Sequence, residues 1–125
     1  MKSKLRVLED FFTIHHLPPD NEVPIYVFDG SFCNITKTAD EISVICSSSV
    51  QLNSTKSETG WSCIKVLGPL DLSLTGLLAD LLTVLAEAKI SIIALSTYDT
   101  DYILVKSEKI NNAIQALRQA EYLFE

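Results

Sequence analysis

The chain has 125 residues, of which 47% are hydrophobic and 21% charged. This composition supports a packed core and excludes an intrinsically disordered chain. Ten basic residues against sixteen acidic ones give a net charge of −6, and the basic residues are scattered along the sequence. Phosphate recognition needs clustered positive charge, so the sequence argues against nucleic acid and anionic membranes as partners.

The cysteine pattern and the hydropathy indicate where the protein works. Cys33, Cys46 and Cys63 lie in apolar runs without Cys-x-x-Cys spacing, which is typical of buried thiols in a reducing compartment. No apolar run approaches the roughly 20 residues that span a bilayer. Glu9 and Asp10 also interrupt the N-terminal apolar stretch where a signal peptide needs its core. We therefore expect a cytoplasmic protein.

The first half of the chain is irregular. The segment Ile14–Phe28 contains three prolines, so we expect only a short helix after Pro24. Ser31–Thr36 and Ile42–Cys46 read as two strands joined by a turn. The following segment, Ser47–Gly60, is rich in Ser, Thr and Asn, which predicts a loop.

The second half opens with a strand over Trp61–Leu67, closed by Gly68-Pro69. Leucines then recur at helical spacing and predict a helix over Leu74–Ala88 with one wide apolar stripe. Ser73 is the expected N-cap of this helix. The stripe consists of Leu74, Leu77, Leu78, Leu81, Leu82 and Leu85.

Two more strands and a helix follow. Ser91–Ser96 and Tyr102–Lys106 are strands joined by a turn at Tyr98–Asp101. Ser107 is the expected cap of the next helix, and Tyr122–Phe124 is a short last strand. The inner face of that helix is predicted to carry Ile110, Ala113, Ile114 and Leu117.

The order of elements is β-α-β-β-α-β, the ferredoxin-like arrangement of the α+β class. A shift of 60 residues aligns Ser31–Thr36 with Ser91–Ser96, and Ile42–Cys46 with Tyr102–Lys106. We therefore expect two tandem modules, a degenerate one over residues 1–60 and a regular one over 61–125. The alternative is an accidental offset, because strand-turn-strand patterns resemble each other.

The segments Gly76–Leu81 and Ala88–Ile92 resemble the ACT domain, a β-α-β-β-α-β module that binds amino acids and regulates metabolic enzymes. Leu95–Val105, Leu-Ser-Thr-Tyr-Asp-Thr-Asp-Tyr-Ile-Leu-Val, is similar to a run found in a tandem-ACT group. That group includes small bacterial proteins and the animal cytosolic arginine sensors. The chain departs from the pattern at Thr75, where the family usually has proline.

The resemblance implies a site for an amino acid between two modules. The α-carboxylate would meet the N–H groups of Thr75, Gly76 and Leu77, since a helix start offers free N–H donors. Backbone groups of a neighbouring module and residues of the second turn would complete the pocket, with Asp101 pairing with a cationic group of the ligand. The further residues of this predicted site are Ser91, Ile92, Thr97, Tyr98 and Asp101. The structural alternative is that Gly76 only eases helix packing and Asp101 only shapes a turn.

The sequence contains no catalytic motif, so we expect no enzyme, no metal and no cofactor. The adjacent His15 and His16 would point to opposite faces of a strand. Gly-x-Ser-x-Gly and phosphate-binding glycine motifs are absent. The predicted function is an allosteric regulator that binds an amino acid, acts in trans and forms a homodimer. The alternative is a protein-interaction or assembly module that binds no ligand.

Overall fold

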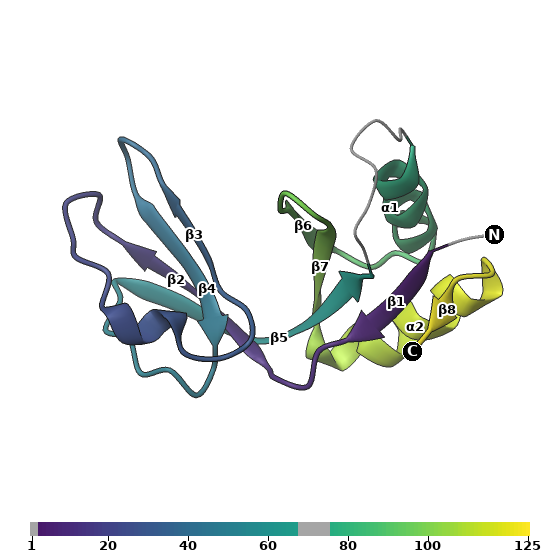
Figure 1. Cartoon of the computed structure of the whole chain (residues 1–125), viewed down its shortest axis with the longest axis horizontal. Helices are drawn as coiled ribbons and strands as arrows, with labels where there is room; N and C mark the ends of the chain where they lie inside the picture. Colours follow the sequence, from purple (N-terminus) through teal and green to yellow (C-terminus); the bar gives the residue numbers. More distant parts are fainter. Residues whose placement is uncertain (1–2, 68–75) are drawn as a thin grey trace. The chain divides into compact units, whose positions relative to one another are not determined.

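The computed structural model describes residues 3–67 and 76–125 (Figure 1). The chain forms two compact units. The smaller unit is Asp10–Gly60, and the larger unit combines Met1–Glu9 with Trp61–Glu125. Each unit is described by itself below.

The smaller unit is a sheet with the strand order β3-β4-β2-β5, to which β5 contributes its first part. A short 3-10 helix follows Pro24, as predicted, and turns Val27 into the core. Val27 packs there with Leu17, Ile42, Val44 and Cys46. The element bounds are β2 Phe12–Leu17, η1 Ile25–Phe28, β3 Asn34–Lys37, β4 Ile42–Ser47 and β5 Lys56–Val66.

The larger unit has the strand order β8-β1-β5-β7-β6 and two helices that pack on each other (Figure 1). The helices bury Leu81 and Leu85 from the first and Ala113 and Leu117 from the second. The remaining bounds are β1 Lys4–Val7, α1 Leu77–Glu87, β6 Ile92–Ser96, β7 Asp101–Lys106, η2 Ser107–Lys109, α2 Ile110–Gln119 and β8 Leu123–Phe124.

The same strand register recurs in both units. Phe12 pairs with Ser47 in the smaller unit, and Trp61 pairs with Lys106 in the larger one. The numbers of equivalent residues therefore differ by 49 between β2 and β5, and by 59 between β4 and β7. The predicted uniform shift of 60 was wrong by one residue at the hairpin. The two hairpin turns begin at Thr38 and Thr97, and each of these threonines donates its backbone N–H to the carbonyl three residues later.

A pair of hydroxyls occupies the same place in both units. Thr13 Oγ1 lies 2.8 Å from Ser48 Oγ, and Ser62 Oγ lies 2.8 Å from Ser107 Oγ. These positions obey the offsets of 49 and 59 residues that the strand pairs set. The fold is thus an internal duplication, consistent with tandem ACT-like modules. Because Ser107 Oγ is engaged with Ser62, the prediction that Ser107 caps a helix was wrong, and no side chain caps η2 or α2.

One strand encoded in the first repeat, β1, belongs to the unit formed by the second repeat. Strand β1 precedes β2 in sequence but pairs with Trp61–Val66 of β5 in the larger unit. The residues before Trp61, Lys56–Gly60, pair beside β2 in the smaller unit. The predicted element order β-α-β-β-α-β is confirmed by β5, α1, β6, β7, α2 and β8. Within the sheet, β1 lies beside β5, and β8 lies outside β1 in a parallel pair. Local periodicity gives no sign of this placement of β1.

The first helix begins later than predicted. Gly76 has φ +86°, a left-handed conformation that cannot continue a helix, so α1 starts at Leu77. The predictions for Gly68–Pro69, Ser73 and Leu74 lie outside the described residues. On α2, Ile114 is half-buried and does not join the core, whereas Ala113 and Leu117 do.

Both helices end in the same way. Lys89 and Glu121 have positive φ, and the next residue donates its N–H to the carbonyl five positions earlier, Leu85 or Leu117. This Schellman ending inserts Ile90 and Tyr122 into the core, where both are buried. The ending of α1 thereby fixes where β6 begins.

Candidate functional site

The start of α1 is the first part of the predicted site. Gly76 is exposed, and a Cβ placed on it would have no neighbouring atom within 4 Å. Packing therefore gives no reason for glycine here; its positive φ does. No described side chain caps this helix start, which leaves its N–H dipoles directed outward. Leu77 is the first helical residue and half-buried, and Thr75 lies outside the described residues.

The β6–β7 turn is the second part. Thr97 donates its hydroxyl to the carbonyl of Thr100 at 3.1 Å, and Tyr98 at the tip is 84% exposed. Asp101 accepts a 2.6 Å hydrogen bond from Ser96 Oγ across the hairpin. The buried Thr100 hydroxyl donates to the carbonyl of Val66, which ties this turn to the end of β5. The Asp101 carboxylate is thus oriented, with its second oxygen available for a ligand.

The predicted residues do not all meet within one unit. Since α1 runs back along the sheet to the start of β6, its own start and the β6–β7 turn share one end (Figure 1). Ser91 and Ile92 stand at the opposite end of β6 from Thr97. The five residues of β6 span about 16 Å. An amino acid cannot bridge that distance, so a site that uses both groups needs two modules.

The buried titratable groups carry structure rather than chemistry. Burial raises the pKa of the Cys63 thiol to about 12 and also raises the pKa values of Cys46 and Cys33. Such thiols are poor nucleophiles at neutral pH. Burial, and then the Asp80 carboxylate that accepts its hydroxyl, raise the pKa of Tyr122. This bond joins the first turn of α1 to the end of α2.

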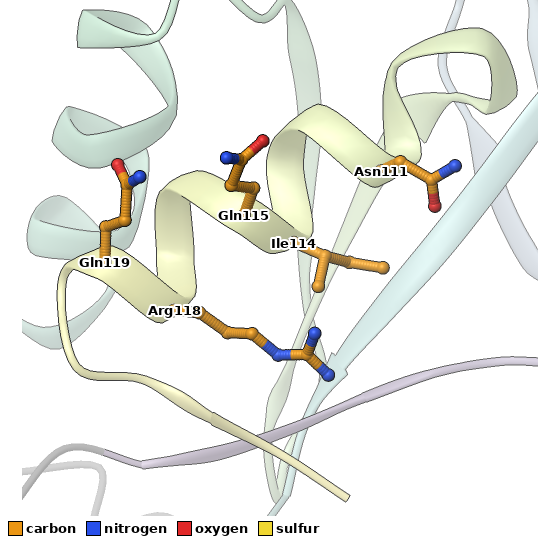
Figure 2. A pocket seen from close by; sticks show the side chains of 5 residues that line it. All are labelled: Asn111, Ile114, Gln115, Arg118 and Gln119. Carbon is orange, nitrogen blue, oxygen red and sulfur yellow. The ribbon is translucent and has the colours of Figure 1, made fainter.

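Two surface hollows were missed by sequence reasoning. One, of about 500 Å³, lies along α2 between Ile114 and Arg118 on one flank and amide side chains on the other (Figure 2). The other, also about 500 Å³, lies in the smaller unit between η1 and the segment after β4. A signal was present for the second, since Ile25-Tyr26-Val27-Phe28 is an apolar run too short to bury all its side chains. The residues lining the first hollow are Asn111, Ile114, Gln115, Arg118 and Gln119.

The sheets and the paired helices define an α+β domain of the ferredoxin-like class. The model of the ACT domain family matches residues 56–119, so the chain belongs to that family. Its domains are regulatory rather than catalytic. A second family model, describing the N-terminal domain of another group of proteins, matches residues 10–50.

Solved structures agree with this fold. A protein of Agrobacterium tumefaciens superposes with a TM-score of 0.91 at 29% identity, covering 100% of this chain and 93% of its own. A Vibrio cholerae protein, described as of unknown function and a possible transport protein, gives 0.71 at 21% identity over 93% and 88%. The allosteric aspartate kinase of Clostridium acetobutylicum gives 0.67 at 13% identity, over 90% of this chain and 33% of the kinase.

No curated protein sequence matched the chain. The finer resemblance to animal arginine sensors stays a prediction. Within residues 3–67 and 76–125, no helix has the length and apolar character required to cross a membrane.

Proposed function

We propose that the protein is a non-catalytic regulator that binds a free amino acid between two ACT modules and acts on another protein in trans. Membership of the ACT domain family carries this proposal, because the matched residues 56–119 include α1, β6 and β7. The fold similarity to an allosteric aspartate kinase supports a regulatory role for this architecture.

The chemistry of the helix start suits the α-carboxylate of the ligand. The N–H groups of Thr75, Gly76 and Leu77 would donate to it, and the helix dipole would favour its negative charge. The open space at Gly76 leaves room for the ligand to approach the backbone. Asp80 in the first turn is already engaged by the Tyr122 hydroxyl, so its charge is partly compensated.

The Asp101 carboxylate suits a cationic side chain. It is held by Ser96 in one orientation, which lowers the entropy lost when a guanidinium or ammonium group binds. Thr97 and Tyr98 would line the pocket beside it. We therefore propose a basic amino acid as the ligand.

Two modules are needed to close the pocket. Ser91 and Ile92, at the far end of β6, would offer backbone groups to a ligand held at the α1 start of a second module. A homodimer supplies that second regular module. The proposed site accordingly exists only in the assembled protein, and ligand and dimer stabilise each other.

The test is the melting temperature of the purified protein against each common amino acid at millimolar concentration. A ligand present at about a hundred times its Kd adds roughly 2.7 kcal/mol, which shifts the melting temperature by several degrees. We expect a shift with one amino acid, and a basic one. No shift with any amino acid would contradict ligand binding and favour the ligand-free interaction module.

Two variants in the same turn localise the effect. Asp101→Asn removes the charge proposed to bind the ligand, whereas Asp99→Asn removes an equal charge two residues away. We expect Asp101→Asn to lower affinity for a basic amino acid about tenfold or more, and Asp99→Asn to change it less than twofold. Equal effects of the two variants would remove Asp101 from the site.

A further inference from the structure

The smaller unit exposes most of an apolar segment that its fold does not use. Of the four residues of η1, only Val27 is buried, at 0% exposure. Ile25 is 84% exposed, Phe28 62% and Tyr26 45%. Ile25 and Phe28, three residues apart on a 3-10 helix, lie on the same face and form an exposed apolar patch with Tyr26 beside it. Exposed apolar patches can mark interaction sites.

A polar hollow adjoins this patch. It lies between η1 and the segment that takes the place of α2 in this repeat, residues 48–54. Asp29, which ends η1, brings a carboxylate to its rim. We call the patch and the hollow together the η1 surface. Its residues are Ile25, Tyr26, Phe28, Asp29, Ser49, Val50, Gln51 and Asn53.

The segment 48–54 is fixed at both ends. The Ser48 hydroxyl lies 2.8 Å from Thr13 Oγ1, and the Ser54 hydroxyl lies 2.9 Å from Nδ1 of the buried His15. Thr55 adds a backbone bond from its N–H to the carbonyl of His16 at 2.9 Å. The η1 surface is therefore formed before any partner arrives, which reduces the entropy lost on binding.

The charge of the smaller unit indicates the kind of partner. Residues 10–60 contain seven acidic and two basic residues, a net charge of −5, whereas the larger unit has nine and eight, a net charge of −1. A second carboxylate, that of Asp10, lies 4.0 Å from the position of a Cβ on Gly30, the residue that follows Asp29. A symmetric contact between two copies would bring these like charges together, which disfavours self-association through this surface.

We propose that the η1 surface docks a basic, amphipathic segment of a partner protein, with apolar side chains against Ile25 and Phe28 and a lysine or arginine against Asp29. The lining residues are mostly exposed, so the hollow is too shallow to enclose a small molecule. This inference rests on the proposed function, since a regulator that acts in trans needs such a contact.

Fluorescent 16-residue peptides test the proposal in the full chain. The probe is an amphipathic lysine–leucine peptide, compared with a scrambled peptide of the same composition and with a glutamate–leucine counterpart. Fluorescence anisotropy gives Kd at 50 and 200 mM NaCl. We expect the amphipathic basic peptide to bind at least tenfold more tightly than either comparison peptide, and more weakly at the higher salt concentration.

Matched variants decide whether binding occurs at the η1 surface. Phe28→Ser should weaken binding about tenfold, and Asp29→Asn about threefold with a smaller salt dependence. The controls are Leu123→Ser, an exposed apolar residue of the larger unit, and Asp40→Asn, an equal charge change in a turn of the smaller unit. Each control should change Kd less than twofold. Because all four side chains lie at the surface, unchanged melting temperatures should accompany these effects.

Three results would overturn the proposal. Equal losses in the variants and their controls would mean non-specific charge attraction. Competition by free lysine or arginine at millimolar concentration that persists in Asp101→Asn would mean a small-molecule site at the η1 surface. A dimer in sedimentation that Phe28→Ser disperses would mean that a second copy covers the surface. Failure of the amino-acid melting test leaves the peptide result untouched, so the two proposals fail separately.

Discussion

The two copies of the repeat differ in their helices and agree in their strands. Repeat one has a 3-10 helix of four residues where repeat two has the eleven residues of α1. It also has an irregular segment after β4 where repeat two has α2. The hairpin register and the hydroxyl pair nevertheless coincide. Strand pairing therefore defines the architecture, and the helix positions are free to diverge toward different tasks.

The cores reflect this difference. Among the described residues, the larger unit buries fourteen hydrophobic side chains, drawn from strands and both helices, whereas the smaller unit buries eight. Less buried apolar area means less stabilisation from the hydrophobic effect. Strand β1 adds to this difference, because residues 1–60 encode it and it pairs with β5 in the larger unit.

Removing β1 should have the largest effect. Deleting residues 1–9 removes β1 and the fully buried Leu5, and leaves β8 without a partner strand among the described residues. Leu5→Ala alone should cost about 2–5 kcal/mol. The deletion should cost more, since the ladder bonds of β1 are also lost. Urea unfolding followed by the fluorescence of Trp61, the single tryptophan, measures both. If the deletion lowers the free energy of unfolding no more than Leu5→Ala does, the result would contradict the pairing of β1 with β5.

Core truncations come next and compare the units directly. Leu85→Ala in the larger unit should cost about 3 kcal/mol because it leaves a cavity in the larger core. Val27→Ala should cost about 2 kcal/mol, since fewer methyl groups are removed. Hydrogen exchange read separately for residues 10–60 and 61–125 should show each loss mainly in its own unit. Uniform loosening of both units by either variant would contradict independent cores.

Stability below neutral pH distinguishes the smaller unit. Burial lowers the pKa of His15, one ring nitrogen bonds Ser54, and Nε2 has no partner among the described residues. The unfolded chain therefore binds more protons than the folded one below pH 6.5. Stability present above that pH is lost as the pH falls toward the lower folded value. His15→Gln should reduce the fall in melting temperature between pH 7 and 5.5, whereas the control variant His16→Gln should not. A profile unchanged by His15→Gln would remove this residue as the cause.

The paired hydroxyls should give the smallest effect. Thr13→Val and Ser62→Ala each break one hydroxyl pair, at a cost of about 1 kcal/mol. Similar losses in the two units would agree with equivalent roles in the two repeats. Chemical denaturation of the two single variants measures both costs. If only one of the two variants lowered stability, the two hydroxyl pairs would share their position in the fold but not their contribution to stability.

The sequence predicted the parts of the fold that local patterns encode. The strands of the second half, the hairpins and the short helix after Pro24 followed from alternation and from proline positions. It did not predict β1 or β2, because two of the four residues of β1 are charged and two of the six residues of β2 are histidines. The pairing of β1 with β5 is non-local, so no pattern within one segment reveals it. Gly76 shifted the helix start because its left-handed backbone conformation is invisible in hydrophobic periodicity.

The chemistry of the candidate site stays a prediction, and the structure bears only on where its residues lie. The helix start and the β6–β7 turn share one end of the unit, as a single pocket requires. Ser91 and Ile92 lie at the opposite end because β6 separates them from Thr97. The hydrogen bond from Ser96 to Asp101 was not predicted, since cross-strand register decides which side chains meet. The η1 surface was not predicted, because the exposure of its side chains depends on how the whole unit packs.

The central claim is that an amino acid binds at the start of α1 and the β6–β7 turn. Two-dimensional ¹⁵N–¹H NMR of the protein, titrated with an equimolar mixture of the twenty amino acids, tests it most directly. We expect the amide signals of Gly76, Leu77, Thr97 and Tyr98 to shift. The signals of Ser91 and Ile92 should shift as well, because these residues would contact the ligand held by the second module. A spectrum that does not change, or changes only within residues 10–60, would contradict the account.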